Sequence, residues 1–199
     1  KADDLPSDLP LNEKIFRSLH SKNVQLISWG ISNFTKLALY DKKTLQNLQI
    51  ILSFLSTKDI VLENTVANCL LTLSKNIGKF IAAPVLSPVI NKLKENPAIE
   101  YAQILSYIIP FLTPTTIECC ILAVIESFIN NRNESFHYAA AELVISNSFE
   151  ILHISTDFFL KLLNSGIIIN YYLTQLIKSA SKTFSKDWIG KILPIYLLQ

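Results

Sequence analysis

The sequence is short of glycine, cysteine and methionine, and each shortage narrows the class of protein. Only 4 Gly occur in 199 residues, all isolated, so no G-x-G-x-x-G dinucleotide turn and no G-x-x-x-x-G-K-[ST] phosphate loop is present. Three Cys cannot form the disulfide framework of a small secreted domain, and we therefore expect a cytoplasmic protein. Met is absent, initiator included, which leads us to expect a processed product or a piece of a longer chain.

Charge is also scarce, at 17% of residues with a net charge of +2, whereas 50% of residues are hydrophobic. This balance is typical of an ordered chain that buries much of its surface. The most apolar stretches are interrupted by Pro110, Pro114, Glu118 and Glu126, so we expect no membrane span, which needs about 20 mostly apolar residues. Residues 1–10 contain three Asp and no apolar core, which predicts an acidic leader rather than a signal peptide.

The sequence repeats itself with a period near 36 residues. Residues 19–26 (LHSKNVQL) align with residues 55–62 (LSTKDIVL), and the match continues where Phe34 meets Leu70 and Leu37 meets Leu73. Similar starts follow at 93, 129 and 163, so that successive steps from residue 19 are 36, 38, 36 and 34. A regular period of this length indicates an array of small supersecondary units.

Each unit reads as a pair of helices. First helices are predicted at residues 11–19, 43–55, 80–93, 115–128 and 156–163, with Asp41 and Thr156 as N-caps and Pro84, Pro88 and Pro110 as local kinks. Second helices carry apolar residues at helical spacing, as in Ile27, Ile31, Phe34 and Ala38. Stacked pairs of this size predict an all-α protein, a right-handed α-solenoid of about five and a half pairs over residues 11–199.

Residues 178–194 (KSASKTFSKDWIGKILP) carry a more specific pattern, in which a helix ends in Phe, a short turn leads to Trp, and an Ile-Leu-Pro step follows. This junction resembles that between repeats in the scaffolding subunit of the type 2A protein phosphatase, a member of the HEAT-repeat family. The remainder of the chain resembles HEAT repeats in its general pattern. The resemblance implies a non-catalytic scaffold that holds phosphatase subunits on its turns and on its concave second helices.

The turns between paired helices carry one basic residue each, namely Lys22, Lys58, Lys94 and Arg132. Equivalent turns of a solenoid lie along one edge, so these residues are predicted to form a positive ridge that meets an acidic protein surface. The other interpretation is that they are ordinary solvated side chains, since Asp59, Glu95 and Glu134 lie close by. A basic ridge also resembles that of the tubulin-binding TOG domains, so tubulin is the alternative partner.

Late in the chain, Tyr171 and Tyr172 cannot both face a helical core, and one of them is a candidate partner contact. Lys178 and Lys182 begin a basic stripe on one helix face and are a second candidate contact, although the low net charge argues against nucleic acid.

The sequence offers little chemistry for catalysis or metal binding. The three His are isolated and lie in no H-E-x-x-H or C-x-x-C pattern, so we expect no metal and no cofactor. Cys119 and Cys120 fall within an apolar predicted helix, where a free Cys acts as a small hydrophobe. A hydrolase that uses one of these thiols as its nucleophile, with His137 as base, remains the least favoured alternative, and we expect no enzyme.

Overall fold

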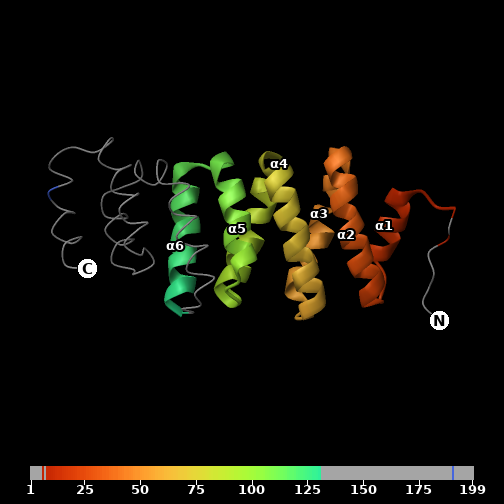
Figure 1. Cartoon of the computed structure of the whole chain (residues 1–199), viewed down its shortest axis with the longest axis horizontal. Coiled ribbons are helices and arrows are strands. Elements are labelled where there is room, and N and C mark those ends of the chain that lie inside the picture. Colours follow the sequence, from red (N-terminus) through yellow and green to blue (C-terminus); the bar gives the residue numbers. More distant parts are fainter. Residues whose placement is uncertain (1–5, 7, 131–189, 191–199) are drawn as a thin grey trace. The chain divides into compact units, whose positions relative to one another are not determined.

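The computed structural model describes residue 6, residues 8–130 and residue 190. Every element in this part of the chain is helical (Figure 1), which confirms the all-α class. The chain divides into two compact units, Lys1–Lys92 and Leu93–Gln199. The predicted fourth and fifth pairs and the N-cap Thr156 lie largely or wholly outside the described residues, so the repeat number stays a prediction.

The first unit begins with two packed helices, α1 (Leu11–Leu19) and α2 (Val24–Tyr40). The bounds of α1 are those predicted from the sequence. Gly30 of α2 makes the close approach possible, because a Cβ on this residue would lie 2.9 Å from the Cβ of Ser18 in α1. The two helices are therefore packed so closely at this point that there is no room for a larger side chain.

The predicted helix over residues 43–55 is split into shorter pieces. It consists of the 3₁₀ segment η1 (Lys42–Asn47), the helix α3 (Leu48–Ser53) and the 3₁₀ turn η2 (Phe54–Ser56). Asp41 caps η1 as predicted, because its carboxylate accepts a hydrogen bond of 3.0 Å from the backbone N–H of Lys43. None of the residues of η1 is buried, so packing does not impose a regular α-helix there.

The longest element, α4 (Ile60–Glu95), consists of two helical arms rather than one straight helix. We call residues 60–76 the first arm and residues 78–95 the second arm. Its backbone leaves helical geometry at Ile77, with φ −135° and ψ 31°. Glu63 in the first arm and Lys92 in the second form an ion pair with Nζ and Oε1 2.8 Å apart. A straight helix would separate these residues by about 43 Å, at about 1.5 Å per residue. The arms therefore fold back on each other at Ile77.

This break corrects the prediction that Pro84 and Pro88 kink the chain. The backbone stays helical at both prolines, and the only non-helical residue inside α4 is Ile77. The φ angle of proline is compatible with a helix, but proline has no N–H, so one backbone hydrogen bond of the helix is lost. The second arm compensates by burying Ile81, Val85 and Val89 completely. The third predicted kink is confirmed in milder form, since α5 passes into a 3₁₀ turn at Pro110.

Residues 36 apart in the first unit share their environment. Buried Ile15 and Leu19 of α1 correspond to buried Ile51 and Leu55. All the buried residues of α2 correspond to buried residues of the first arm of α4: Ile27 to Glu63, Gly30 to Val66, Ile31 to Ala67, Phe34 to Leu70 and Ala38 to Ser74. The sequence period is therefore also a period of burial.

The two second helices of this unit also begin in the same way. Oδ1 of Asn23 accepts hydrogen bonds from the N–H groups of Gln25 and Leu26, at 2.9 and 3.4 Å. Oδ1 of Asp59, 36 residues later, accepts them from Val61 and Leu62, at 2.9 and 3.2 Å. Side-chain oxygens at this position satisfy N–H groups that have no partner within the helix.

The second unit is described over residues 93–130 and residue 190. It contains α5 (Ile99–Ile108), the 3₁₀ turn η3 (Ile109–Phe111) and α6 (Pro114–Asn130). Ser127 of α6 is buried and donates a hydrogen bond of 3.0 Å to the carbonyl of Leu93. The burial period continues, because four buried residues of α5 lie 38 positions after buried residues of α4: Tyr101, Ile104, Leu105 and Ile108.

Candidate partner-binding surfaces

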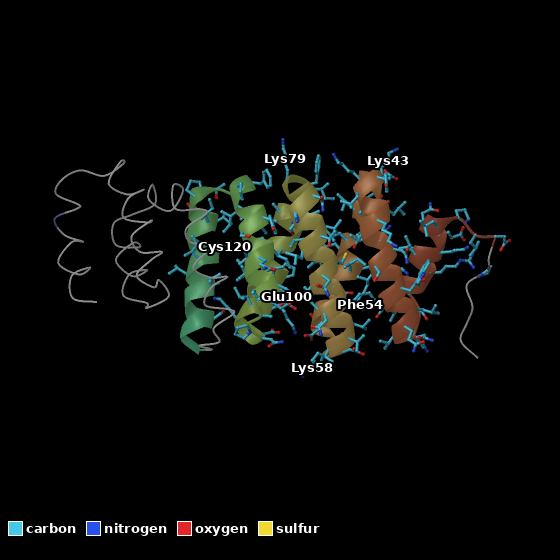
Figure 2. All side chains as sticks on the ribbon, viewed as in Figure 1. Lys43, Phe54, Lys58, Lys79, Glu100 and Cys120 are labelled. Atoms are coloured by element: carbon cyan, nitrogen blue, oxygen red, sulfur yellow. The ribbon has the colours of Figure 1, made fainter. Side chains whose placement is uncertain are left out.

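Two members of the predicted basic ridge, Lys22 and Lys58, lie in the first unit and are exposed. Lys22 lies in the turn before α2, which begins at the lower end of Figure 1, and Lys58 is labelled at the lower end of Figure 2. The two turns that contain these residues therefore lie toward the same end of the first unit. They flank the two capping residues Asn23 and Asp59.

Lys58 holds an unusual backbone conformation, since its φ of 58° lies in the left-handed region. This geometry costs a non-glycine residue of the order of 1 kcal/mol. It turns the chain between η2 and α4 and places Asp59 where it caps the first arm. Lys22, in the equivalent turn, is not in this region.

The other two ridge residues, Lys94 and Arg132, lie outside the first unit. Lys94 belongs to the second unit and lies in the last turn of α4 rather than in the turn that follows, because the helix continues to Glu95. Residue 96 precedes Pro97, and the residue before a proline is disfavoured in helical geometry. Arg132 lies outside the described residues, as do Tyr171, Tyr172, Lys178 and Lys182.

A second basic cluster lies at the opposite end of the first unit. Lys43 and Lys79 are both labelled at the upper end of Figure 2. Lys42 adjoins Lys43, and its Nζ lies 3.7 Å from the centre of the Phe80 ring. Lys75 lies four residues before Lys79, on the other side of the backbone break at Ile77. We call these four residues, Lys42, Lys43, Lys75 and Lys79, the upper lysines.

The upper lysines were missed in reading the sequence, although a signal for them is present. Lys79 lies 36 residues after Lys43, so the two occupy equivalent repeat positions. Apolar spacing predicts a helix that starts at Lys43 and gives no information about the basic pair Lys42 and Lys43. Aligning polar residues by the period, as well as apolar ones, would have predicted the cluster.

A groove of about 480 Å³ runs between α2 and the first arm of α4, and it falls within the range of roughly 300–1,000 Å³ typical of ligand sites. We call it the α2–α4 groove. Its lining is mostly uncharged and polar, and Lys36 is its one cationic residue. The lining residues are Ser32, Thr35, Lys36, Leu39, Thr65, Asn68, Cys69 and Thr72.

Three of the four hydroxyl groups of this groove donate to their own helices, and the fourth, that of Thr35, donates to the sulfur of Cys69. Ser32 donates to the carbonyl of Ser28 at 2.9 Å, Thr65 to that of Val61 at 2.7 Å, and Thr72 to that of Asn68 at 3.0 Å. Their oxygen lone pairs remain available as acceptors. The groove therefore offers acceptor oxygens to the N–H groups of a bound molecule.

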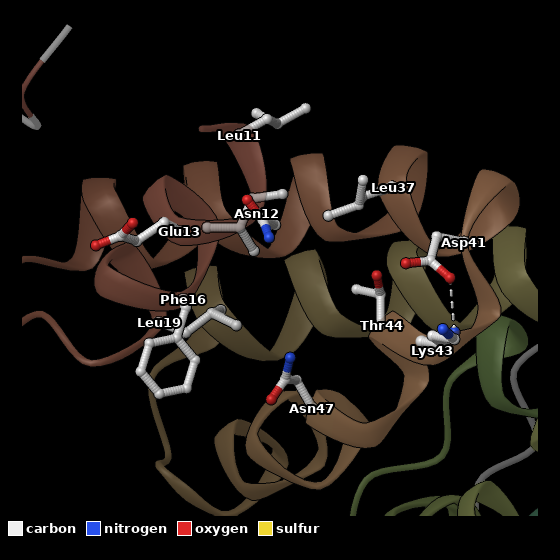
Figure 3. Close-up of a pocket in the computed structure, with 11 residues that line it drawn as sticks. Leu11, Asn12, Glu13, Phe16, Leu19, Leu37, Asp41, Lys43, Thr44 and Asn47 are labelled. Atoms are coloured by element: carbon white, nitrogen blue, oxygen red, sulfur yellow. Dashed lines mark hydrogen bonds between the residues drawn. The ribbon is translucent and has the colours of Figure 1, made fainter. Parts of the chain in front are cut away.

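A larger groove of about 620 Å³ lies beside α1 (Figure 3). Its apolar residues include Leu11, Ile15 and Phe16 of α1 and Leu37 of α2. Asp41 lies at its edge with its carboxylate on the backbone of Lys43. Leu11 and Phe16 are each 46% exposed, so α1 presents an apolar face that the described residues leave open.

The cysteines differ in exposure. Cys69 is buried at the floor of the α2–α4 groove, where burial raises the pKa of its thiol to about 11 although Thr35 donates a hydrogen bond of 2.9 Å to the sulfur. Burial, with a smaller effect of neighbouring Cys119, raises the pKa of Cys120 to about 12. Cys120 is therefore a thiol rather than a thiolate at neutral pH, which argues against it as a nucleophile. Cys119 is exposed, and His137 lies outside the described residues.

Within the described residues, no group of three or more His, Cys, Asp and Glu side chains is placed to hold a metal ion. One described helix, α4, is long and apolar enough to cross a membrane by length and composition. Its most apolar window has a mean hydropathy of 1.2 and is 44% buried within the protein. The Glu63–Lys92 ion pair joins the two arms of α4, so its 36 residues fold back and do not form one straight helix.

Comparison with known proteins gave no match: neither the models of protein families, nor the curated proteins, nor the solved structures contain one that is significantly similar to this chain.

Proposed function

We propose that the protein is a non-catalytic scaffold built from HEAT-like helical pairs, which binds partner proteins on its turns and on its second helices. The observation that supports this most is the period of 36 residues in burial and capping, carried by pairs such as Phe34 with Leu70 and Asn23 with Asp59. Repeated units of this kind bury their apolar faces against neighbours and leave long surfaces for binding.

The first proposed contact is the edge that contains the turns of Lys22 and Lys58, which we call the lower edge. Lys22 and Lys58 are exposed, and Lys58 keeps a strained backbone at this turn. Lys94 and Arg132 are proposed to extend the edge through the later repeats. The partner is proposed to be a phosphatase catalytic or regulatory chain, in keeping with the resemblance of residues 178–194 to the phosphatase scaffold.

Tubulin is retained as the second candidate because Lys22 and Lys58 share one exposed edge. The two partners are distinguished by charge reversal of the ridge, in which Lys22, Lys58, Lys94 and Arg132 are all replaced by Glu. Tubulin binding should be abolished and should weaken steeply with salt, because it would depend on the ridge charges. A phosphatase subunit, with contacts shared over several units, should lose only part of its affinity.

The measurement is direct binding of the purified full chain to purified tubulin dimer and to a purified phosphatase catalytic subunit, with wild type and variant compared at low and moderate salt. Circular dichroism melts of both chains control for folding. Absence of binding to either protein would remove both named partners.

A further inference from the structure

The α2–α4 groove has a one-sided charge distribution. Lys36 lines it, Lys75 follows the groove residue Thr72 on the first arm of α4, and both lysines are exposed. Helix α2 contains no Asp or Glu, and the only acid in residues 60–79 is Glu63, which is buried against Lys92. The accessible side chains of these two helical segments therefore carry positive charge without a compensating negative one.

The lining also matches the groups of an extended main chain. Ser32, Thr65 and Thr72 direct their protons to their own helices and keep acceptor oxygens toward the groove. The side chain of Asn68 is exposed and makes no hydrogen bond within the described part of the chain. An amide both donates and accepts, as a peptide group does.

From this combination we infer that the α2–α4 groove binds an extended, acidic segment of a partner protein, with its carboxylates on Lys36 and Lys75. The inference rests on the proposed scaffold function and names the chemistry of a partner. A protein segment is favoured over nucleic acid because no aromatic side chain lines the groove for base stacking. It is favoured over a lipid surface because the lining contains only one large apolar side chain, Leu39.

The groove is distinct from the predicted ridge. Lys58 is labelled at the lower end of the first unit, whereas Lys43 and Lys79 are labelled at its upper end (Figure 2). Charge reversals at the two ends therefore change the net charge equally but at separate places. This provides a matched control for general electrostatic attraction.

The first step of the test is selection from a phage-displayed library of random peptides on the immobilised full chain. We expect the enriched peptides to contain an excess of Asp and Glu. The most enriched peptide is then made with a fluorescein label, and its affinity is measured by fluorescence anisotropy. Enrichment of peptides without excess acid would overturn the inference.

The second step compares three charge variants. Lys36→Glu with Lys75→Glu should weaken the peptide by about tenfold or more, whereas Lys22→Glu with Lys58→Glu should change it by about twofold or less. The neutral pair Lys36→Gln with Lys75→Gln should give an intermediate loss and serves if the reversed pair fails to fold, as judged by circular dichroism. Equal losses at both ends, or no loss at the groove, would overturn the inference.

Two further probes test other polyanions. Single-stranded oligothymidylate and phosphatidylserine vesicles should bind more weakly than the selected peptide. Tighter binding of either, with loss in the Lys36→Glu and Lys75→Glu variant, would reassign the surface and overturn the inference. Failure of the groove is distinguishable from failure of the scaffold: if the groove variant still binds partner proteins, only the groove inference fails, and if the wild type binds none, the scaffold fails as well.

Discussion

Ser74 and Ser127 are both buried serines with opposite hydrogen-bond status. Ser127 donates to the carbonyl of Leu93, whereas the hydroxyl of Ser74 has no hydrogen-bond partner in the described part of the chain. A buried polar group without a partner costs about 1–3 kcal/mol. The position equivalent to Ser74 in the preceding helix is occupied by Ala38, which has no such group to satisfy.

The replacement Ser74→Ala should therefore stabilise the protein by about 1 kcal/mol. The matched control is Ser127→Ala, which should destabilise it by about 1 kcal/mol because the Leu93 carbonyl loses its donor. Denaturant unfolding of both variants measures the difference. A loss of stability in Ser74→Ala would mean that its hydroxyl is satisfied after all.

Burial of the Cys69 thiol makes the stability of the protein depend on pH. Its pKa is raised from the ordinary value of 9.0 to about 11 by burial. Above pH 9.0 the unfolded thiol loses its proton while the folded thiol keeps it, so the folded state binds more protons and its stability falls with pH. The contribution of Cys69 to the free energy of unfolding is fully present below pH 9.0 and is lost as the pH rises through about 11.

We predict that the wild type loses stability faster than the Cys69→Ser variant between pH 9.0 and about 11. The extra slope should be at most about 1.4 kcal/mol per pH unit, which is the value for one proton. Denaturant unfolding of both chains across this window isolates the thiol from the lysines and tyrosines that they share. Parallel stability curves would show that Cys69 is not protected from ionisation.

At the scale of the element, a buried ion pair joins the two arms of α4. The side chains of Glu63 and Lys92 are 11% and 10% exposed, and Ile27 occupies the position equivalent to Glu63 in the preceding repeat. A buried pair gains little over apolar residues, but removing one partner alone is costly. The pair therefore specifies which faces of the two arms meet more than it adds to stability.

Glu63→Leu alone should cost about 3–5 kcal/mol, and adding Lys92→Leu should restore most of this loss. The exposed pair of Glu13 and Arg17, with Oε1 and Nη2 2.7 Å apart, is the control. Its coupling energy should be only about 0.3–0.5 kcal/mol. Double-mutant cycles from denaturant unfolding measure both, and equal coupling in the two pairs would contradict the buried role of the first.

Sequence reasoning succeeded where apolar periodicity decides the structure and failed where local geometry does. The spacing of Ile27, Ile31 and Phe34 predicted α2, and the bounds of α1 were predicted residue for residue. The break at Ile77 was missed because its sequence contains no proline or strong turn signal other than Gly78. The sequence instead predicts a kink at Pro84, although tertiary packing of its neighbours keeps that arm helical.

The candidate surfaces were predicted only in part. Lys22 and Lys58 lie at one edge because turn positions repeat with the period of the helices. The α2–α4 groove and the upper lysines could not be found from apolar positions, since they are made by polar residues on the open face of two helices. Their meeting depends on how the helices pack, which composition and spacing alone do not determine.

At the scale of the whole molecule, the proposed scaffold has two candidate binding surfaces, and both lie in the first unit. Lys22 and Lys58 lie in the turns before α2 and α4, and Lys43 and Lys79 lie at the opposite end of this unit. Opposite edges with separate basic groups allow one scaffold to hold more than one partner segment.

The most direct test of the scaffold claim is affinity capture from a lysate with the immobilised 199-residue chain. Capture is carried out at low and moderate salt, with the reversed pair at each end as a control, and is read by quantitative mass spectrometry. The scaffold proposal predicts that a defined protein, a phosphatase subunit first of all, is retained by the wild type and reduced by the reversal at one end only. Capture of no protein above a bead control, or equal loss from both reversals, would contradict it.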